Sequence, residues 1–92
     1  MAEPLAEITD YAQLVEALRA RVDAQHIVIS RIDDVTGLSD GRTRQLLDPR
    51  GRKKFDDLTL GPVLGALGVK LILVEDPATA RYLARVERKQ RA

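Results

Sequence analysis

The chain has 92 residues, 45% of them hydrophobic, and a formal net charge of +1. This length suffices for one domain. So small a domain buries only about 60–65% of its unfolded surface and is marginally stable alone, and dimerisation is a common remedy for this low stability. The absence of cysteine excludes disulfides and cysteine-ligated zinc, and the single histidine, His26, excludes a multi-histidine metal site. Without an apolar run near the ~20 residues that span a bilayer, or a recognisable signal peptide, we expect a soluble cytoplasmic protein with no membrane partner and no cofactor.

Charge is distributed unevenly along the sequence. Residues 41–54 include six basic residues and one acidic residue, and residues 77–92 include five basic residues and one acidic residue. The remaining stretches, 1–40 and 55–76, are net acidic. Two basic zones in a nearly neutral protein can steer an anionic polymer, although charge runs are also found on ordinary solvated surfaces.

The sequence predicts a single domain that covers residues 1–92. Its N-terminal third is expected to consist of a short N-terminal segment and one amphipathic helix. Residues 1–8 are expected to be flexible. Asp10 is a candidate N-cap, and Gln13 can complete a capping box. Apolar residues then recur at three- and four-residue steps and predict a helix to about Ala24: Ile8, Tyr11, Leu14, Val15, Leu18 and Val22.

The stretch that begins at residue 26 fits two structures. Its β-branched residues 27–29 could begin a strand, whereas the spacing of Ile29, Ile32 and Val35 and the charged residues among them favour a helix. Gly37 then supplies a helix stop, because glycine accepts a left-handed backbone at little cost.

A second, shorter helix follows this glycine. Ser39 is its candidate N-cap, and the helix is expected to run to about Leu47 because the residue before Pro49 avoids helical angles. A basic loop follows. Thr59 is the candidate cap of a further helix that ends at Gly68.

The C-terminal part, residues 69–92, is predicted to hold a strand and a last helix. Five of the seven residues 69–75 are apolar and predict a buried strand, which needs residues 26–29, the N-terminus or a second copy of the chain as its partner. Asp76 and Pro77 suit the start of a helix. Together these elements form a candidate dimer interface.

Residues 29–47 read as helix, glycine turn, the hydrophobic Leu38, a capping residue and a short helix with a basic outer face. The stretch "IDDVTGLSDGRTRQLL" resembles helix two, turn and recognition helix of the lambda-repressor/Cro-like (XRE-type) helix-turn-helix family. "LVEALRARV" is similar to that family's first helix and "TLGPVLGALGVKL" to its fourth. The resemblance covers roughly residues 11–71. It implies a mainly α fold of five helices with one C-terminal β-strand, which could pair across a dimer.

Several positions depart from the family pattern. Val28 and Ile29 stand where a polar cap and a glutamine usually open helix two, and an aspartate, Asp33 or Asp34, stands where a small residue is usually packed. Thr43 replaces a branched aliphatic residue. Asp40 and Gly41 occupy early positions of the recognition helix.

The resemblance also implies a set of DNA-binding residues. In the major groove, arginine pairs with guanine edges and glutamine with adenine. Lysine and arginine on a neighbouring loop would contact phosphates without reading sequence. The candidate groove residues are Arg42, Arg44 and Gln45, with Ser39 at the helix start, and the candidate phosphate contacts are Arg50, Arg52, Lys53 and Lys54.

The sequence therefore predicts a non-enzymatic protein that binds double-stranded DNA sequence-specifically, a transcriptional regulator acting as a homodimer. The acidic pairs Asp33-Asp34 and Asp56-Asp57 do not suggest catalysis, because neighbouring helical residues point about 100° apart. The alternative is a protein-interaction module, such as an antitoxin or adaptor, that uses the same fold without DNA. The apolar opening of helix two and Asp40 motivate this alternative.

Overall fold

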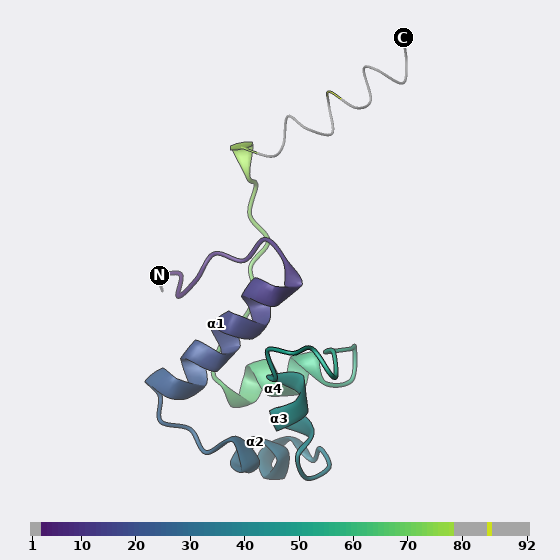
Figure 1. Cartoon of the computed structure of the whole chain (residues 1–92). Coiled ribbons are helices and arrows are strands. Elements are labelled where there is room, and N and C mark those ends of the chain that lie inside the picture. Colours follow the sequence, from purple (N-terminus) through teal and green to yellow (C-terminus); the bar gives the residue numbers. More distant parts are fainter. Residues whose placement is uncertain (1–2, 79–84, 86–92) are drawn as a thin grey trace.

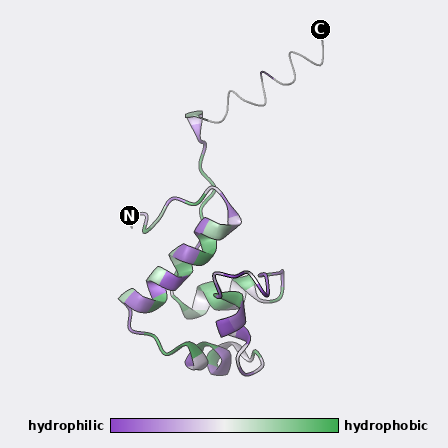
Figure 2. Ribbon diagram, viewed as in Figure 1, coloured by the Kyte–Doolittle hydropathy of each residue, from purple (hydrophilic) through white to green (hydrophobic). Residues whose placement is uncertain are grey.

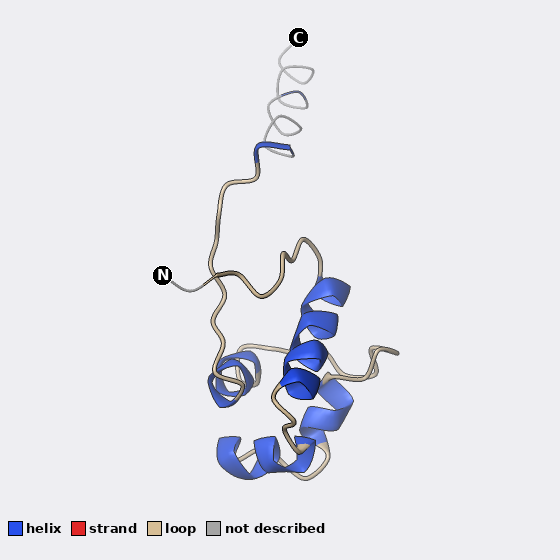
Figure 3. Ribbon diagram, turned by 90° about the vertical axis from the view of Figure 1, so that its left-hand side faces the viewer, coloured by secondary structure: helices blue, strands red, loops and turns tan. Residues whose placement is uncertain are grey.

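The computed structural model describes residues 3–78 and residue 85. It contains four helices, α1 (Tyr11–Ala24), α2 (Ile29–Thr36), α3 (Arg42–Leu46) and α4 (Leu60–Ala66) (Figure 1). The three shorter helices gather around the C-terminal half of α1 in both ribbon views (Figures 1 and 3). The mainly α class is thus confirmed for the described part of the chain. None of its helices is long and apolar enough to cross a membrane.

The core is formed by one apolar side from each helix. Leu14, Leu18 and Val22 extend along α1 and meet apolar residues of the other three helices in one cluster. Figure 2 shows the contrast between the mostly hydrophilic α3 and the paler to hydrophobic α4. Burial of each such side chain stabilises the fold by roughly 1.5–3 kcal/mol. The buried hydrophobic residues are Leu14, Val15, Leu18, Val22, Ile32, Leu46, Leu47, Val63 and Leu67.

Helix α1 begins and ends where the sequence predicts. The Asp10 carboxylate accepts a hydrogen bond from the Gln13 N–H at 2.8 Å, which confirms the N-cap. The Gln13 side chain also turns back, but its Oε1 accepts from the N–H and hydroxyl of Thr9, at 2.7 and 2.9 Å, rather than from Asp10. Ile8 and Tyr11, at the start of the predicted apolar stripe, remain more than a third exposed because the body of the protein begins one turn later.

The helical alternative is confirmed for residues 29–36, and the strand alternative for residues 27–29 is wrong. After α1 ends, His26 adopts a left-handed backbone, with φ of 52°, which turns the chain away from the axis of α1. Helix α2 begins three residues later. Gly37 stops α2 as expected: its φ is 79° and its N–H donates to the Asp33 carbonyl at 2.9 Å.

The expected N-cap of the short helix is wrong. Helix α3 begins at Arg42, three residues after Ser39, and the Ser39 carbonyl instead closes a turn by accepting from the Arg42 N–H at 3.0 Å. The residue at the N-cap position is Gly41, which has no side chain and a φ of 82°. The cap must therefore come from elsewhere in the chain.

Asp33 of α2 supplies that cap. Its Oδ2 accepts from the Gly41 N–H at 2.9 Å, and its Oδ1 accepts from the Thr43 N–H at 2.9 Å and from the Thr43 hydroxyl at 2.6 Å. Only 2% of Asp33 is exposed. Burial by itself raises the pKa of the carboxyl, but the hydrogen bonds from Thr43 and Gly41 outweigh burial and hold the pKa below its ordinary value. Asp33 is therefore a buried, charged cap.

The cap of α4 also differs from the expectation. Thr59 stands at the N-cap position but makes no side-chain bond to the helix. The Thr59 hydroxyl donates to Asp56 Oδ1 at 2.9 Å and accepts from the Asp56 N–H at 3.0 Å. Asp56 Oδ1 also accepts from the N–H groups of Leu58 and Thr59, both at 3.0 Å. Asp56 thus caps a turn that leads into α4. At the other end, the Arg21 Nε–H donates to the Leu67 carbonyl at 3.1 Å and ties α1 to α4.

The strand expected at 69–75 is not formed, and no strand occurs in the described part of the chain. Residues 27–29, one of its expected partners, lead into α2 instead, and no other described segment pairs with it. Residues 69–76 have no regular structure, and the chain becomes helical at Pro77 and Ala78. Further along the expected fifth helix only residue 85 is described, and it is helical; the other residues of that helix lie outside the described part of the chain.

We expect Asp33→Ala to lower the free energy of unfolding by about 2–4 kcal/mol, because it leaves three donors without their charged acceptor. Asp34→Ala is the matched control: Asp34 is exposed in the same helix, and its removal should change stability by no more than about 0.5 kcal/mol. Urea denaturation followed by circular dichroism measures both. Equal effects of the two substitutions would contradict the role of the Asp33 cap.

Candidate functional site

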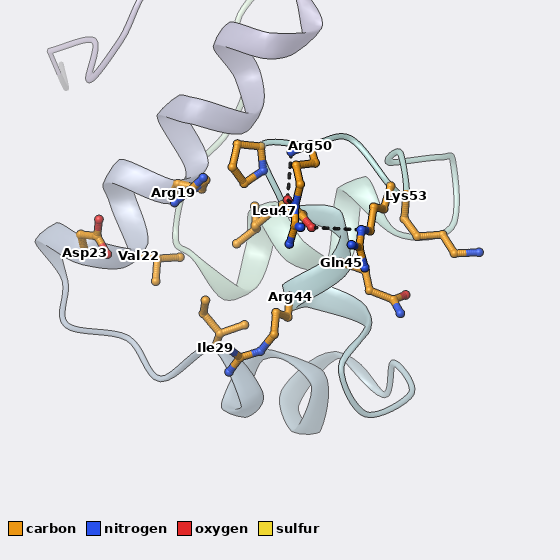
Figure 4. Close-up of a pocket in the computed structure, with 12 residues that line it drawn as sticks. Arg19, Val22, Asp23, Ile29, Arg44, Gln45, Leu47, Arg50 and Lys53 are labelled. Atoms are coloured by element: carbon orange, nitrogen blue, oxygen red, sulfur yellow. Dashed lines mark hydrogen bonds and ion pairs between the residues drawn. The ribbon is translucent and has the colours of Figure 1, made fainter.

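A concave surface of about 580 Å³ lies between α1, the start of α2, α3 and the loop after α3 (Figure 4). We call it the cationic surface. It is lined by Arg19, Val22, Asp23, Ile29, Arg44, Gln45, Leu47, Asp48, Pro49, Arg50, Arg52 and Lys53.

The lining combines positive charge with an apolar floor. Five of its residues are lysine or arginine and two are aspartate, so cations are in excess by three. Val22 and Leu47 belong to the buried core, which makes the base of this surface apolar. Hollows of one charge sign with low-dielectric walls concentrate the electric field and attract opposite charges. The surface is therefore suited to an extended anion.

Helix α3 presents two of the predicted groove residues to this surface. Thr43 and Leu46 face inward, with exposures of 0% and 1%, so the intervening Arg44 and Gln45 face outward. Figure 4 shows Arg44 extending from α3 on the side of Ile29. Within the described residues Arg44 has no carboxylate within ion-pair distance, so its guanidinium keeps its donors available.

The loop after α3 is organised by Asp48. Its Oδ1 accepts from the Arg50 N–H at 2.9 Å and lies 3.3 Å from Arg50 Nε, and its Oδ2 lies 3.9 Å from Arg52 Nε. The hydrogen bond from the Arg50 backbone is the main reason that the pKa of Asp48 is lowered, and burial opposes it. The Asp48 side chain is 15% exposed, against 71% and 65% for the two arginines. Asp48 therefore engages both arginines through Nε and leaves their outer guanidinium nitrogens exposed.

Three predicted site residues lie elsewhere. Lys54 Nζ lies 5.9 Å from the ring centroid of Tyr11, whose hydroxyl accepts from the Phe55 N–H at 2.7 Å. Arg42 is half-buried, and its charge adds a small part to the lowering of the Asp56 pKa, which the Thr59 hydroxyl chiefly causes. Ser39 is exposed in the turn before α3 and does not line the cationic surface.

Arg19 is a residue of this surface that the sequence analysis did not select. It follows the buried Leu18 and precedes the buried Val22 by three residues, so helical periodicity places it at the edge of the inner face of α1. That periodicity was a usable signal. The approach of α1 to the loop 48–53 had no sequence signal, since it depends on how the helices pack.

The chain matches no protein-family model, no curated protein and no solved structure. The resemblance to the lambda-repressor/Cro-like family therefore stays a prediction.

We expect Asp48→Asn to loosen Arg50 and Arg52. The amide oxygen can still accept from the Arg50 N–H, but the attraction between the carboxylate and the two guanidinium groups is lost. Solvent exchange of the arginine Nε–H protons, measured by NMR, should become faster at both arginines. Asp57→Asn, at an exposed position outside the surface, should leave both rates unchanged. Unchanged exchange in Asp48→Asn would show that the carboxylate does not hold them.

Proposed function

We propose that the protein binds double-stranded DNA through the cationic surface. The observation that supports this most directly is the meeting of Arg44 and Gln45 of α3 with the cations of the loop 48–53 and with Arg19 on one concave face. Phosphate contacts from such cations provide affinity, and contacts from a helix to base edges provide specificity.

Helix α3 would supply few base contacts. It has five residues and is therefore only about 7.5 Å long. Arg44 suits a bidentate contact to guanine, and Gln45 suits one to adenine. Because Arg42 is half-buried beside Asp56, it is less available than the sequence suggested. Specificity would therefore depend mainly on two adjacent residues of α3.

The cations around α3 would contact the phosphate backbone. Arg19 of α1 and Arg50, Arg52 and Lys53 of the loop after α3 line the concave surface, and none of them is buried. With about four phosphates neutralised, the logarithm of the binding constant should fall with the logarithm of salt concentration at a slope of about −3 to −4.

The same proposal includes the regulatory role that the resemblance implies. The protein would be a lambda-repressor/Cro-like transcriptional regulator that acts in the cytoplasm as a homodimer, completed by a fifth, C-terminal helix. Two copies related by a two-fold axis would bind half-sites about 34 Å apart on an inverted repeat.

A protein-interaction module, such as an antitoxin or adaptor, is the second candidate. Exposed apolar side chains favour it, because Val28, Val35 and Leu58 are 63%, 74% and 74% exposed. Such a module would bind its partner through apolar contact. Its affinity would depend little on salt, which separates it from a DNA-binding protein.

We expect Arg44→Ala to weaken binding to a duplex selected from a random pool by roughly 1–3 kcal/mol and to relax base choice at one position. Lys53→Ala should instead weaken all duplexes alike and reduce the salt slope by about 0.9. Lys54→Ala is its matched control: the same charge is removed from the next residue, which lies against Tyr11 and outside the cationic surface. Fluorescence anisotropy over a salt series measures all three.

Two results would overturn the proposal. The first is a wild-type protein that binds no duplex even at low salt. The second is an equal, non-selective loss of affinity in Lys53→Ala and Lys54→Ala, since the loss would then reflect net charge and not the cationic surface.

A further inference from the structure

The loop 48–55 carries three cations of the cationic surface and is held at both of its ends. At its start, the Gly51 N–H donates to the Asp48 carbonyl at 3.0 Å and closes a turn in which Gly51 has a φ of 68°. At its end, the Phe55 N–H donates to the Tyr11 hydroxyl at 2.7 Å. Within the described part of the chain, the backbone of residues 52–55 makes no other hydrogen bond. The course of the second half of the loop therefore depends on Tyr11.

Tyr11 is suited to hold the loop because its own place is fixed. It is the first residue of α1 and directly follows the cap that Asp10 forms with the Gln13 N–H. Tyr11 is 36% exposed, so burial in the core does not account for an aromatic residue at this position. Its hydroxyl instead reaches a residue 44 positions away in the sequence. A phenol carries this acceptor at the end of a rigid ring, which loses little conformational freedom on binding.

Tyr11 holds Lys54 through both its backbone and its charge. The Phe55 N–H and the Lys54 carbonyl belong to one planar peptide group, so the bond to the Tyr11 hydroxyl fixes the orientation of both. The Lys54 ammonium lies 5.9 Å from the centroid of the Tyr11 ring, within the distance at which a cation is attracted to an aromatic face. Lys54 therefore lies outside the cationic surface, whereas the preceding Lys53 lines the edge of that surface (Figure 4).

We propose that Tyr11 is a positioning residue for DNA binding, which selects Lys53 and not Lys54 as the lysine of this loop that contacts the phosphate backbone. The two lysines carry the same charge on equally long, flexible side chains, so with a free loop end either of them could approach a phosphate. With Lys54 held against Tyr11, only Lys53 is directed to the cationic surface. The choice between the lysines rests on the proposed function, but the hold of Tyr11 on the loop can be tested without DNA.

Amide hydrogen exchange of the full chain, measured by NMR, is the test without DNA. Tyr11→Phe keeps the ring beside Lys54 and removes only the hydroxyl. The Phe55 N–H should then exchange roughly two- to tenfold faster, as expected for the loss of one ordinary hydrogen bond. Thr9→Val is the matched control, because it removes a hydroxyl that binds at the start of α1 and not to the loop. Unchanged exchange of Phe55 in Tyr11→Phe would overturn the proposal, as would equal acceleration in both variants.

Fluorescence anisotropy with a duplex over a salt series tests the choice between the lysines. Tyr11→Leu removes the hydroxyl and the aromatic face together, so it releases Lys54 completely. In this background Lys53→Ala and Lys54→Ala should reduce the salt slope by similar amounts, each smaller than the reduction of about 0.9 expected for Lys53→Ala in the wild type. A residue that only stabilised the fold would not change which lysine contributes. A slope that still depends on Lys53 alone would contradict the positioning role.

The positioning role and the proposed function fail in different ways. A wild-type protein that binds no duplex refutes DNA binding and with it the choice between the lysines, while the exchange of Phe55 still decides whether Tyr11 holds the loop. Binding that depends on Lys53 alone in the wild type and in both Tyr11 variants refutes the positioning role and leaves DNA binding in place. Tyr11→Phe, which keeps the ring, should shift the dependence partway toward Lys54, so the test also holds if Tyr11→Leu lowers stability.

Discussion

The buried carboxylate of Asp33 is the contact on which the rest of the architecture depends. A helix of five residues is not stable by itself, because forming its first turn costs more than its few hydrogen bonds return. Asp33 satisfies the N–H groups of Gly41 and Thr43 at the α3 N-terminus, and Thr43 and Leu46 anchor α3 in the core. With its beginning and inner face fixed, α3 can present only Arg44 and Gln45 outward. The cationic surface is thus a consequence of a cap contributed by α2.

Aspartate has the same organising role elsewhere in the chain. Asp10 caps α1, Asp56 caps the turn before α4, and Asp48 holds the loop after α3. Each of these carboxylates accepts hydrogen bonds from backbone N–H groups of its own turn or loop. Because the negative charges are used in this way, most of the lysine and arginine side chains stay exposed. A net charge of +1 is therefore compatible with a strongly cationic concave face. At Asp48 the two functions meet, since one carboxylate both shapes the loop and engages Arg50 and Arg52.

Local patterns predicted the local structure well. The apolar spacing and Asp10 gave α1 its limits, and Gly37 marked the end of α2. The cap of α3 was missed because capping rules describe residues about three positions apart, whereas Asp33 lies eight residues before Gly41 and reaches it between two helices. The strand expected at 69–75 is not formed in the single chain because a strand needs a partner, and residues 27–29, one of its expected partners, lead into α2 instead. Likewise, only packing shows that Lys54 lies against Tyr11 and that Arg19 joins the loop 48–53.

The most direct test of this account is an NMR titration of Asp33. Because its pKa is lower in the folded than in the unfolded chain, its stabilising contribution is complete above the unfolded pKa and is lost as pH falls through the folded pKa. We expect the Asp33 carboxyl carbon to titrate below the ordinary aspartate value, with the amide protons of Gly41 and Thr43 shifting in the same transition. An Asp33 that titrates at or above the ordinary value, with those two amides unaffected, would contradict the cap and with it the placement of α3.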